Sequence, residues 1–421
     1  MAIAAALGIF LLAILGTPLF VILGLAAMTA FHISDVQLSA IAIEIYKVSS
    51  QPSILTIPLF TFAGYMMAES KSPQRLLKLS DALLGWLPGG VAIMGLVVCA
   101  FFTAFTGASG VTIIALGGLL YPILMNEGYS EKFSLGLITT SGSLGLLFPP
   151  SLPIILYGMV AKVDIDSLFR AGILPGILLI VVLSTWAVMN GVKANRTTTK
   201  KLIWTDVWVA FKGCIWEALL PVAILIGIYG GFVTTTEAAS LTAFYIFVIE
   251  CFIYKDLDPF KDIPRVTKES MSLVGGILLI LCCALGFTNW LVDEEIPMKI
   301  LDFMREYLTN KYSFLFFLNI FLLIVGALMD IFSAIIVVVP LIVPIAKEFG
   351  VDPVHLAIIF LANLEIGYIT PPVGINLFIS SFRFERPVTE LYRACIPYLI
   401  LLILALGIIT YVPLLSLALV R

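Results

Sequence analysis

Long apolar runs separated by short polar segments make up most of this chain. A helix that crosses a membrane needs about 20 consecutive apolar residues, and lipid admits only helices or closed barrels, whose backbone groups are all hydrogen-bonded. The pattern therefore predicts an all-α polytopic membrane protein. Apolar runs of helical length cover residues 3–31, 36–50 (short, with Glu44 and Lys47), 52–69, 131–160, 168–191, 214–232, 236–254, 271–291, 353–382 and 392–417.

Two further apolar stretches are too long for one straight crossing. They cover Val91–Met125 and Ser313–Ala346, about 35 residues each, and both are interrupted near the middle. At about 1.5 Å per residue, either stretch would exceed the apolar thickness of a bilayer. We therefore expect two re-entrant hairpins of half-depth helices, at about 89–127 and 311–349.

An amphipathic segment directly precedes each expected hairpin. Residues 73–87 and 297–309 mix charges with Leu, Trp, Met and Phe at helical spacing. Such segments lie in the membrane interface, although ordinary surface helices have the same pattern. Their position before the hairpins favours a role as arms of a frame.

Composition agrees with a membrane protein and narrows its chemistry. Of 421 residues, 61% are hydrophobic and 12% are charged, about half the charged share of a soluble chain. The net charge of −3 gives no reason to expect nucleic acid. The six cysteines lack CxxC spacing and the histidines are His32 and His355 alone, so we expect neither a histidine-ligated metal nor an organic cofactor.

Basic residues predict the orientation, because cytoplasmic loops are enriched in Lys and Arg. With the N-terminus outside, 16 of the 24 basic residues lie inside. The segments 193–201 and 255–268 carry many of them, which makes residues 192–213 a cytoplasmic linker.

The chain also resembles itself at an offset of 222 residues. Gly and Pro interrupt helices, so matching positions indicate two units that break at the same places. Chance would explain one or two coincidences, but not six. An odd number of spans between equivalent points makes the units inverted, with repeats at 1–191 and 214–421. The matched pairs are Gly64 with Gly286, Pro122 with Pro344, Gly128 with Gly350, Gly145 with Gly367, Pro149 with Pro371 and Pro150 with Pro372.

Each repeat contains a helix broken by a proline pair, at 131–160 and 353–382. Proline removes an amide donor and frees backbone carbonyls, which at membrane depth must line a polar cavity. C-terminal ends of half-helices suit a cation such as Na⁺. Neutral oxygen donors stand beside the breaks and tips: Ser109, Ser141, Ser143, Ser333, Asn363 and Thr370.

Two carboxylates lie within apolar stretches, Asp330 at the second hairpin tip and Glu365 near the second break. A carboxylate at membrane depth costs about 2.5–3.5 kcal/mol by insertion scales, which makes it a functional candidate. The alternative is a structural partner for a hydroxyl or a helix terminus. The tip position favours Asp330 as the functional group.

The sequence resembles the large membrane subunit of tripartite ATP-independent periplasmic (TRAP) transporters. The segments GLLFPPSLPIILYGMVAKVDIDSLFRAGILPG and LANLEIGYITPPVGINLF carry the resemblance, supported by IPLFTFAGYMM and TTTEAAS. The resemblance implies an elevator-type fold of the ion-transporter superfamily in the bacterial inner membrane. It also implies sodium-driven uptake of a small organic acid, such as a C4-dicarboxylate or sialic acid. A periplasmic substrate-binding protein and a small four-helix membrane subunit would be its partners.

The resemblance also implies sites for at least two Na⁺ ions and a substrate region between the two tips. This chain departs from many relatives at TTTEAAS and at GASG. The departure at GASG affects which groups would bind the ligand. The first Na⁺ site would comprise Gly107, Ser109, Gly110, Ser141, Gly145 and Pro149. The second would comprise Asp330, Ser333, Asn363, Gly367, Thr370 and Pro372. The substrate region would comprise Ser109, Ser143, Asp330, Asn363 and Asn376.

Rival interpretations are weaker. GASG resembles the nucleophile motif of rhomboid intramembrane proteases, but neither histidine is expected at the depth of Ser109, so an enzyme is not predicted. No phosphate-binding G-x-x-x-x-G-K-[ST] loop is present. A stand-alone divalent-anion/sodium symporter of the same architecture remains the alternative within transport.

Overall fold

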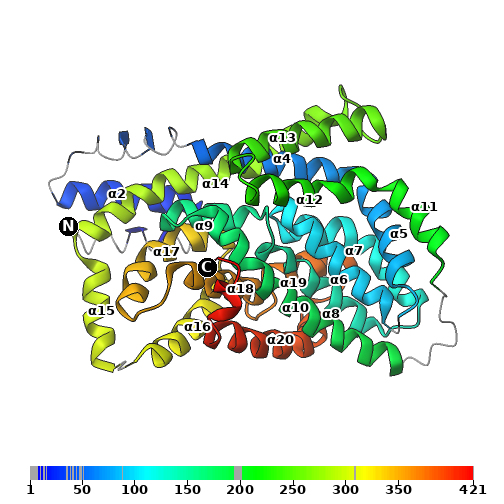
Figure 1. Ribbon diagram of the computed structural model, residues 1–421. Coiled ribbons are helices and arrows are strands. Elements are labelled where there is room, and N and C mark those ends of the chain that lie inside the picture. Colours follow the sequence, from blue (N-terminus) through cyan, green and yellow to red (C-terminus); the bar gives the residue numbers. More distant parts are fainter. Residues whose placement is uncertain are drawn as a thin grey trace.

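The computed structural model is built of helices throughout the part of the chain that it describes (Figure 1). It describes residues 8–420 except 10, 13, 14, 16, 35, 36, 38, 40, 41, 44, 47–49, 51, 88, 194–201, 308 and 309. Seven of the described helices are long and apolar enough to cross a membrane, or up to nine spans if each of two bent helix pairs counts as one. The chain is a multi-pass membrane protein.

The first half contains two long hairpin helices, a broken helix and a long span. Its elements are α2 (Leu19–Ile33), η1 (Pro52–Leu55), α4 (Thr56–Glu69), α5 (Ser72–Leu84), α6 (Gly90–Thr106), α7 (Ser109–Asn126), α8 (Glu131–Ser141), η2 (Leu144–Leu147), α9 (Leu152–Ala161) and α10 (Ile165–Lys193).

The second half repeats this order after a helical connection. Its elements are α11 (Trp204–Gly213), α12 (Ile215–Tyr229), α13 (Thr235–Val248), the π-helical turn η3 (Ile249–Ile253), α14 (Asp262–Asp293), α15 (Ile296–Tyr307), α16 (Lys311–Leu328), α17 (Ile331–Glu348), α18 (Pro353–Gly367), α19 (Ile375–Phe384), α20 (Val388–Tyr411) and α21 (Leu414–Leu417).

One predicted boundary needs correction. The first span does not run unbroken over 3–31, because α2 begins at Leu19 after Pro18, which supplies no amide hydrogen to a preceding turn. Within the predicted linker at residues 192–213, α11 forms and packs on α5. The predicted short span at 36–50 lies largely outside the described residues, as does most of the chain before Leu19.

The repeat is visible in the helix boundaries. α7 and α17 contain 18 residues each, and their first residues, Ser109 and Ile331, are 222 positions apart. Both hairpins are followed by a glycine in the left-handed region, Gly128 at φ +80° and Gly350 at φ +72°. Ser130 and Asp352 then cap the next helices by accepting backbone N–H bonds. Glycine and capping residues at equivalent positions therefore end and begin the helices at the same places in both halves.

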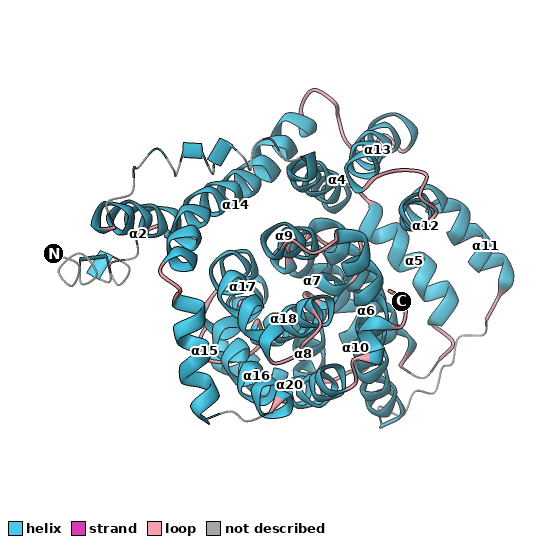
Figure 2. Ribbon diagram, turned by 60° about the vertical axis from the view of Figure 1, so that its left-hand side comes forward, coloured by secondary structure: helices cyan, strands magenta, loops and turns pink. Residues whose placement is uncertain are grey.

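The helices form a central bundle that is flanked on part of its outline by an outer frame (Figure 2). We define the central bundle as α6–α10 with η2, together with α16–α20, and the outer frame as α2, α4, α5 and α11–α15. Within the central bundle the halves interlock, because α17 packs on α9 and α19 packs on α7. The repeats are therefore not separate compact bodies. The predicted arms are α5 and α15, and they contact the hairpin helices α6 and α17.

A buried ion cluster joins one arm to the rest of the frame. Arg75 of α5 contacts three carboxylates, Glu217 of α12, Glu250 of η3 and Asp256. The Tyr254 ring lies 3.8 Å from the guanidinium carbon. Burial opposes the charge of Arg75, but hydrogen bonding to Asp256 and the charges of Glu217 and Glu250 together raise its pKa. The cluster stabilises the arm only while all its charges remain paired.

Candidate functional site

The first hairpin turns at Gly107, which has φ +63° and ends α6. A Cβ on Gly107 would lie 2.5 Å from the Leu152 Cβ, and one on Gly110 would lie 2.7 Å from Ile379 Cδ1. The tip therefore packs against α9 of its own half and α19 of the other half. Such close approach is possible because both positions lack a side chain.

The first break lies against this hairpin. α8 ends at Ser141, and the Thr103 hydroxyl of α6 donates to the Gly142 carbonyl at 2.7 Å. A Cβ on Gly145 would meet the backbone of α6 at Ala100 O, 2.2 Å away. The break thus follows from a glycine that admits another backbone and from Pro149 and Pro150, which have no amide hydrogens. The six predicted residues of the first cation site, three at the tip and three along the break, lie in this region.

At the second tip, Asp330 acts as the N-cap of α17. Its Oδ1 accepts the backbone N–H groups of Phe332 and Ser333, each at 3.0 Å, and its Oδ2 accepts the Ser333 hydroxyl. Asp330 as a whole is half-buried. The structure therefore shows the helix-terminus contact that the sequence left as an alternative.

The second break packs on the second hairpin in the same manner as the first. A Cβ on Gly367 would lie 2.5 Å from the backbone of Gly326 in α16. The Tyr368 hydroxyl accepts the Ile331 N–H at 2.8 Å, which ties the break to the tip. Thr370 donates to the Ile366 carbonyl at 2.9 Å. Gly367, Thr370, Asp330 and Ser333 therefore belong to one region.

Two predicted members of the second cation site lie at its margin. Asn363 is fully buried, and its amide nitrogen donates to Asn319 Oδ1 at 2.7 Å rather than to the tip. Asn319 is in turn hydrogen-bonded to Thr410 at 3.1 Å. Pro372 is exposed, and its carbonyl accepts the Tyr392 hydroxyl.

The two broken helices meet in the middle of the bundle. The Ser143 hydroxyl lies 3.4 Å from the Glu365 carbonyl oxygen. The Asn376 amide donates to the Thr139 carbonyl at 3.1 Å. Of the predicted substrate residues, Ser143 and Asn376 therefore face the partner repeat, whereas Ser109 and Asp330 belong to the two tips.

Buried polar atoms without hydrogen-bond partners gather on the broken helices. An unpaired buried polar group is costly, so it normally marks a place for water, an ion or a ligand. Among the described residues, such atoms on these helices and their breaks include Ser151 Oγ, Tyr157 Oη, Asn363 Oδ1, both carboxyl oxygens of Glu365, and Asn376 Oδ1.

These donors fit a monovalent cation better than a divalent metal. They are hydroxyl, amide and backbone oxygens, with Asp330 as the charged group at a tip. In the described part of the chain no cluster of three or more His, Cys, Asp or Glu could hold a metal ion. Neutral oxygens near half-helix ends are the kind of site that binds Na⁺ in broken-helix transporters.

Sequence reasoning missed several of these polar residues. Thr103 and Thr112 form a hydroxyl pair inside the first hairpin at 2.8 Å. Asn319 and Thr410 reach Asn363 from α16 and α20. Asn319 could have been predicted, because it is a polar residue inside an apolar run. The threonines could not, because threonine is common in membrane helices.

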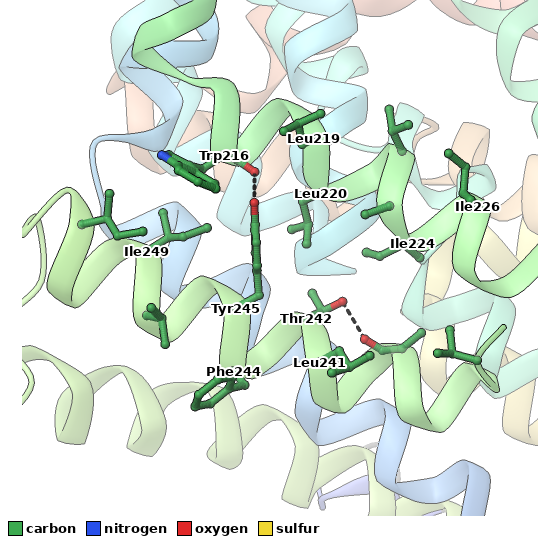
Figure 3. A pocket seen from close by; sticks show the side chains of 16 residues that line it. Trp216, Leu219, Leu220, Ile224, Ile226, Leu241, Thr242, Phe244, Tyr245 and Ile249 are labelled. Atoms are coloured by element: carbon green, nitrogen blue, oxygen red, sulfur yellow. Dashed lines mark hydrogen bonds between the residues drawn. The ribbon is translucent and has the colours of Figure 1, made fainter.

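An apolar groove on the outer frame is not this site. It lies between α12 and α13, with a volume of about 630 Å³, and its lining includes Trp216, Leu220 and Phe244 (Figure 3). Its hydroxyls are satisfied: Tyr245 donates to the Trp216 carbonyl at 2.9 Å and Thr242 to the Ala238 carbonyl at 2.7 Å. No charged side chain lines it, so it offers nothing to a cation or a carboxylate.

Two hairpins paired with two broken helices, inside a bundle of apolar helices, define a membrane transporter. The YdaH transporter of Alcanivorax borkumensis shares this fold, with a TM-score of 0.61 at 14% identity over 88% of this chain and 86% of that one. The model of the family described as tripartite ATP-independent periplasmic transporter, DctM component, matches residues 6–415. The chain belongs to this family.

Curated relatives support the assignment. The C4-dicarboxylate TRAP transporter large permease protein DctM of Rhodobacter capsulatus is 33% identical, over 96% of this chain and 95% of that protein. The isethionate TRAP transporter permease protein DctMQ of Oleidesulfovibrio alaskensis is 36% identical over 95% of this chain, which matches 63% of that longer protein. The chain is a large permease of a TRAP transporter and not an enzyme.

Proposed function

We propose that this chain carries a small organic anion into the cell together with at least two Na⁺ ions. The observation that supports the proposal is the pair of matched breaks, each packed against its hairpin and accompanied by buried oxygens. Two equivalent sites poor in formal charge suit Na⁺, because divalent ions require more carboxylates.

The proposed Na⁺ ligands lie at the hairpin tips and along the breaks. The first Na⁺ would bind at Gly107, Ser109, Gly110, Ser141, Gly145 and Pro149. The second would bind at Asp330, Ser333, Gly367 and Thr370, with Asn363 and Pro372 at the margin. When bound, the ions would supply positive charge beside the tips, where α7 and α17 begin. Helix N-termini also favour anions, so substrate carboxylate would bind between the tips, near Ser143 and Asn376.

The relatives' names support the choice of substrate class and one partner. The two relatives are named for C4-dicarboxylates and for isethionate, which are both small anions. The name DctMQ and the length beyond this chain fit a fusion with a second membrane component. We therefore include a small four-helix subunit and a periplasmic binding protein in the proposal, with the assembly in the bacterial inner membrane. The repeats would be inverted, and the central bundle would move against the outer frame as an elevator.

Uptake into vesicles tests this function. Vesicles holding this chain and the small subunit should accumulate labelled succinate or isethionate only when the binding protein and a Na⁺ gradient are both present. The dependence on Na⁺ should have a Hill coefficient above 1, because two ions bind. Thr370→Val keeps the shape but removes one proposed ligand, so half-maximal uptake should require several-fold more Na⁺.

Thr185→Val is the matched control. Its hydroxyl donates to Val181 four residues earlier, as that of Thr370 does to Ile366, but it lies on the exposed side of α10. It should leave the Na⁺ dependence unchanged. Equal uptake without the binding protein would establish the stand-alone symporter instead, and uptake driven by a proton gradient in the absence of Na⁺ would contradict sodium coupling.

A further inference from the structure

A polar contact joins the central bundle to the outer frame at the start of α10. The Thr235 hydroxyl, in the first turn of α13, donates to Asp166 Oδ1 at 3.0 Å. Asp166 lies in the first turn of α10, so the bond runs from the frame to the bundle. Both residues lie in segments that carry the family resemblance, but neither has a part in the proposed Na⁺ or substrate sites.

The neighbouring side chains make local contacts instead. Asp164 Oδ2 accepts the backbone N–H of the residue three positions ahead at 2.8 Å, at the start of α10. Thr234 caps α13, and Thr236 Oγ1 lies 3.4 Å from a carbonyl within the frame. Neither Asp166 nor Thr235 therefore provides the hydrogen bond that begins its own helix, and the bond between them has another role.

A second contact lies one helical turn further along α10. The guanidinium carbon of Arg170 lies 5.0 Å from the centre of the Tyr229 ring, at the end of α12. A cation over the face of an aromatic ring is attracted by the electrons of the ring. The Tyr229 hydroxyl is buried and has no hydrogen-bond partner in the part of the chain that the structure describes, so the ring makes the contact. Asp166 and Arg170, four residues apart, thus reach the frame from one side of α10.

These contacts suit a joint that opens and closes. Asp166, Arg170 and Thr235 are half-buried, so water can reach their polar groups when the contacts break. Exchanging such a hydrogen bond for bonds to water has a small net effect on free energy. The buried cluster around Arg75 is different, because separating it would leave charges without a partner. Among the described helices, α10 also does not pack extensively on α12 or α13, so side chains make the connection.

We propose that Asp166 and Thr235, with Arg170 and Tyr229 beside them, form a latch that holds the central bundle against the outer frame in the conformation described here. The bond breaks when the bundle moves, and the Asp166 carboxylate and the Thr235 hydroxyl then bind water. The latch thereby increases the population of this conformation during transport. The movement rests on the proposed function, whereas the contact itself does not.

Distances between spin labels on the full chain in lipid vesicles test the latch. In a cysteine-free background, labels are attached at Lys132→Cys in α8 and at Lys261→Cys before α14. Both lysines are exposed, one in the bundle and one in the frame. Thr235→Val removes the hydroxyl at nearly constant size. It should lower the ratio of the wild-type distance to other distances about two- to tenfold, as the loss of one hydrogen bond predicts. Thr236→Val is the matched control and should leave the ratio unchanged.

Thr235→Pro is a second variant that should keep the helix. Thr235 is the first residue of α13, where the helix does not need the amide hydrogen. The preceding Thr234 is already extended, at φ −72° and ψ 162°, as a residue before proline must be. Thr235→Pro should therefore shift the distances as Thr235→Val does. A wild-type distribution in both Thr235 variants, or the same change in Thr236→Val, would overturn the latch.

Combined variants identify the partners. Asp166→Ala should lower the same ratio, and Thr235→Val should then have little further effect, because the bond is already lost. Effects that add in full would contradict the bond. Tyr229→Phe keeps the ring and should retain the wild-type ratio, whereas Tyr229→Leu should lower it. Equal ratios in the two Tyr229 variants would contradict the contribution of the ring.

Uptake of labelled succinate or isethionate separates the latch from the proposed function. If the Thr235 variants shift the distances but wild-type uptake does not depend on Na⁺, the latch is supported and the proposed function fails. If wild-type uptake depends on Na⁺ but the Thr235 variants keep the wild-type distances, the latch alone fails.

Discussion

At the residue scale, the breaks depend on glycines that admit a neighbouring backbone. Gly145 faces Ala100 and Ala104 of α6, and Gly367 faces Gly326 and Ala327 of α16. These contacts involve main-chain atoms, which cannot turn aside as a flexible side chain can. The two positions therefore hold each broken helix against its hairpin in the same way.

Gly367→Ala should destabilise the protein. The new Cβ would lie 2.5 Å from the Gly326 backbone, and overpacking of this kind costs about 1–3 kcal/mol. Gly407→Ala is the control, because nothing lies within 4 Å of the corresponding Cβ inside α20. Unfolding in detergent, followed by tryptophan fluorescence, should show a lower free energy of unfolding for the first variant alone. Equal stability of the two variants would mean that the backbones separate without cost.

The contacts of the buried polar residues could be predicted from the sequence only in part. The tip position of Asp330 and its expected contact with a helix terminus or a hydroxyl follow from its place in the sequence. The contact of Glu365 does not, because its carbonyl oxygen faces the hydroxyl of Ser143 in the other half of the chain. The same holds for Asn363, whose partner Asn319 lies 44 residues away.

At the element scale, the arm α5 is fixed by charge as well as by packing. The side chains of Glu217 and Glu250 are fully buried, and Arg75 is the cation between them. The Tyr254 hydroxyl also donates to Glu217 Oε2 at 3.0 Å. This cluster joins segments that are about 140 to 180 residues apart in sequence, so it links the arm to the frame.

Arg75→Met should loosen the arm. Two buried carboxylates would lose their counter-charge, and breaking a buried pair in this way costs about 3–5 kcal/mol. Arg265→Met is a fair comparison, because Arg265 pairs with Glu69 at the surface with 49% of its side chain exposed. Such exposed pairs contribute about 0–1 kcal/mol. The same unfolding measurement checks the difference, and similar losses for both variants would contradict the structural role of the cluster.

At the scale of the whole molecule, orientation in the membrane is set by basic loops rather than by packing. The predicted cytoplasmic segment 193–201 lies mostly outside the described residues, but its position can be measured chemically. In a cysteine-free background, Thr198→Cys should resist an impermeant maleimide in intact cells and react after permeabilisation. Asp293→Cys, on the predicted outer side, should react in intact cells. The reverse labelling pattern would invert the topology.

The sequence by itself determined most of the spans, the paired hairpin helices, the broken helices and the spacing of the repeat. These features depend on local physical chemistry: apolar length, Gly and Pro positions and helix caps such as Ser130 and Asp352. The family was also evident from motifs at the breaks.

Only the tertiary structure decided how the halves interlock, with α17 on α9 and α19 on α7. It also decided that α11 folds onto α5, that three carboxylates surround Arg75, and that Glu365 meets the first break. These contacts join segments far apart in the chain. No local sequence pattern predicts these contacts, because apolar helices of similar composition can pack in many pairings. Side chains and glycines at the contacts decide which pairing is the most stable.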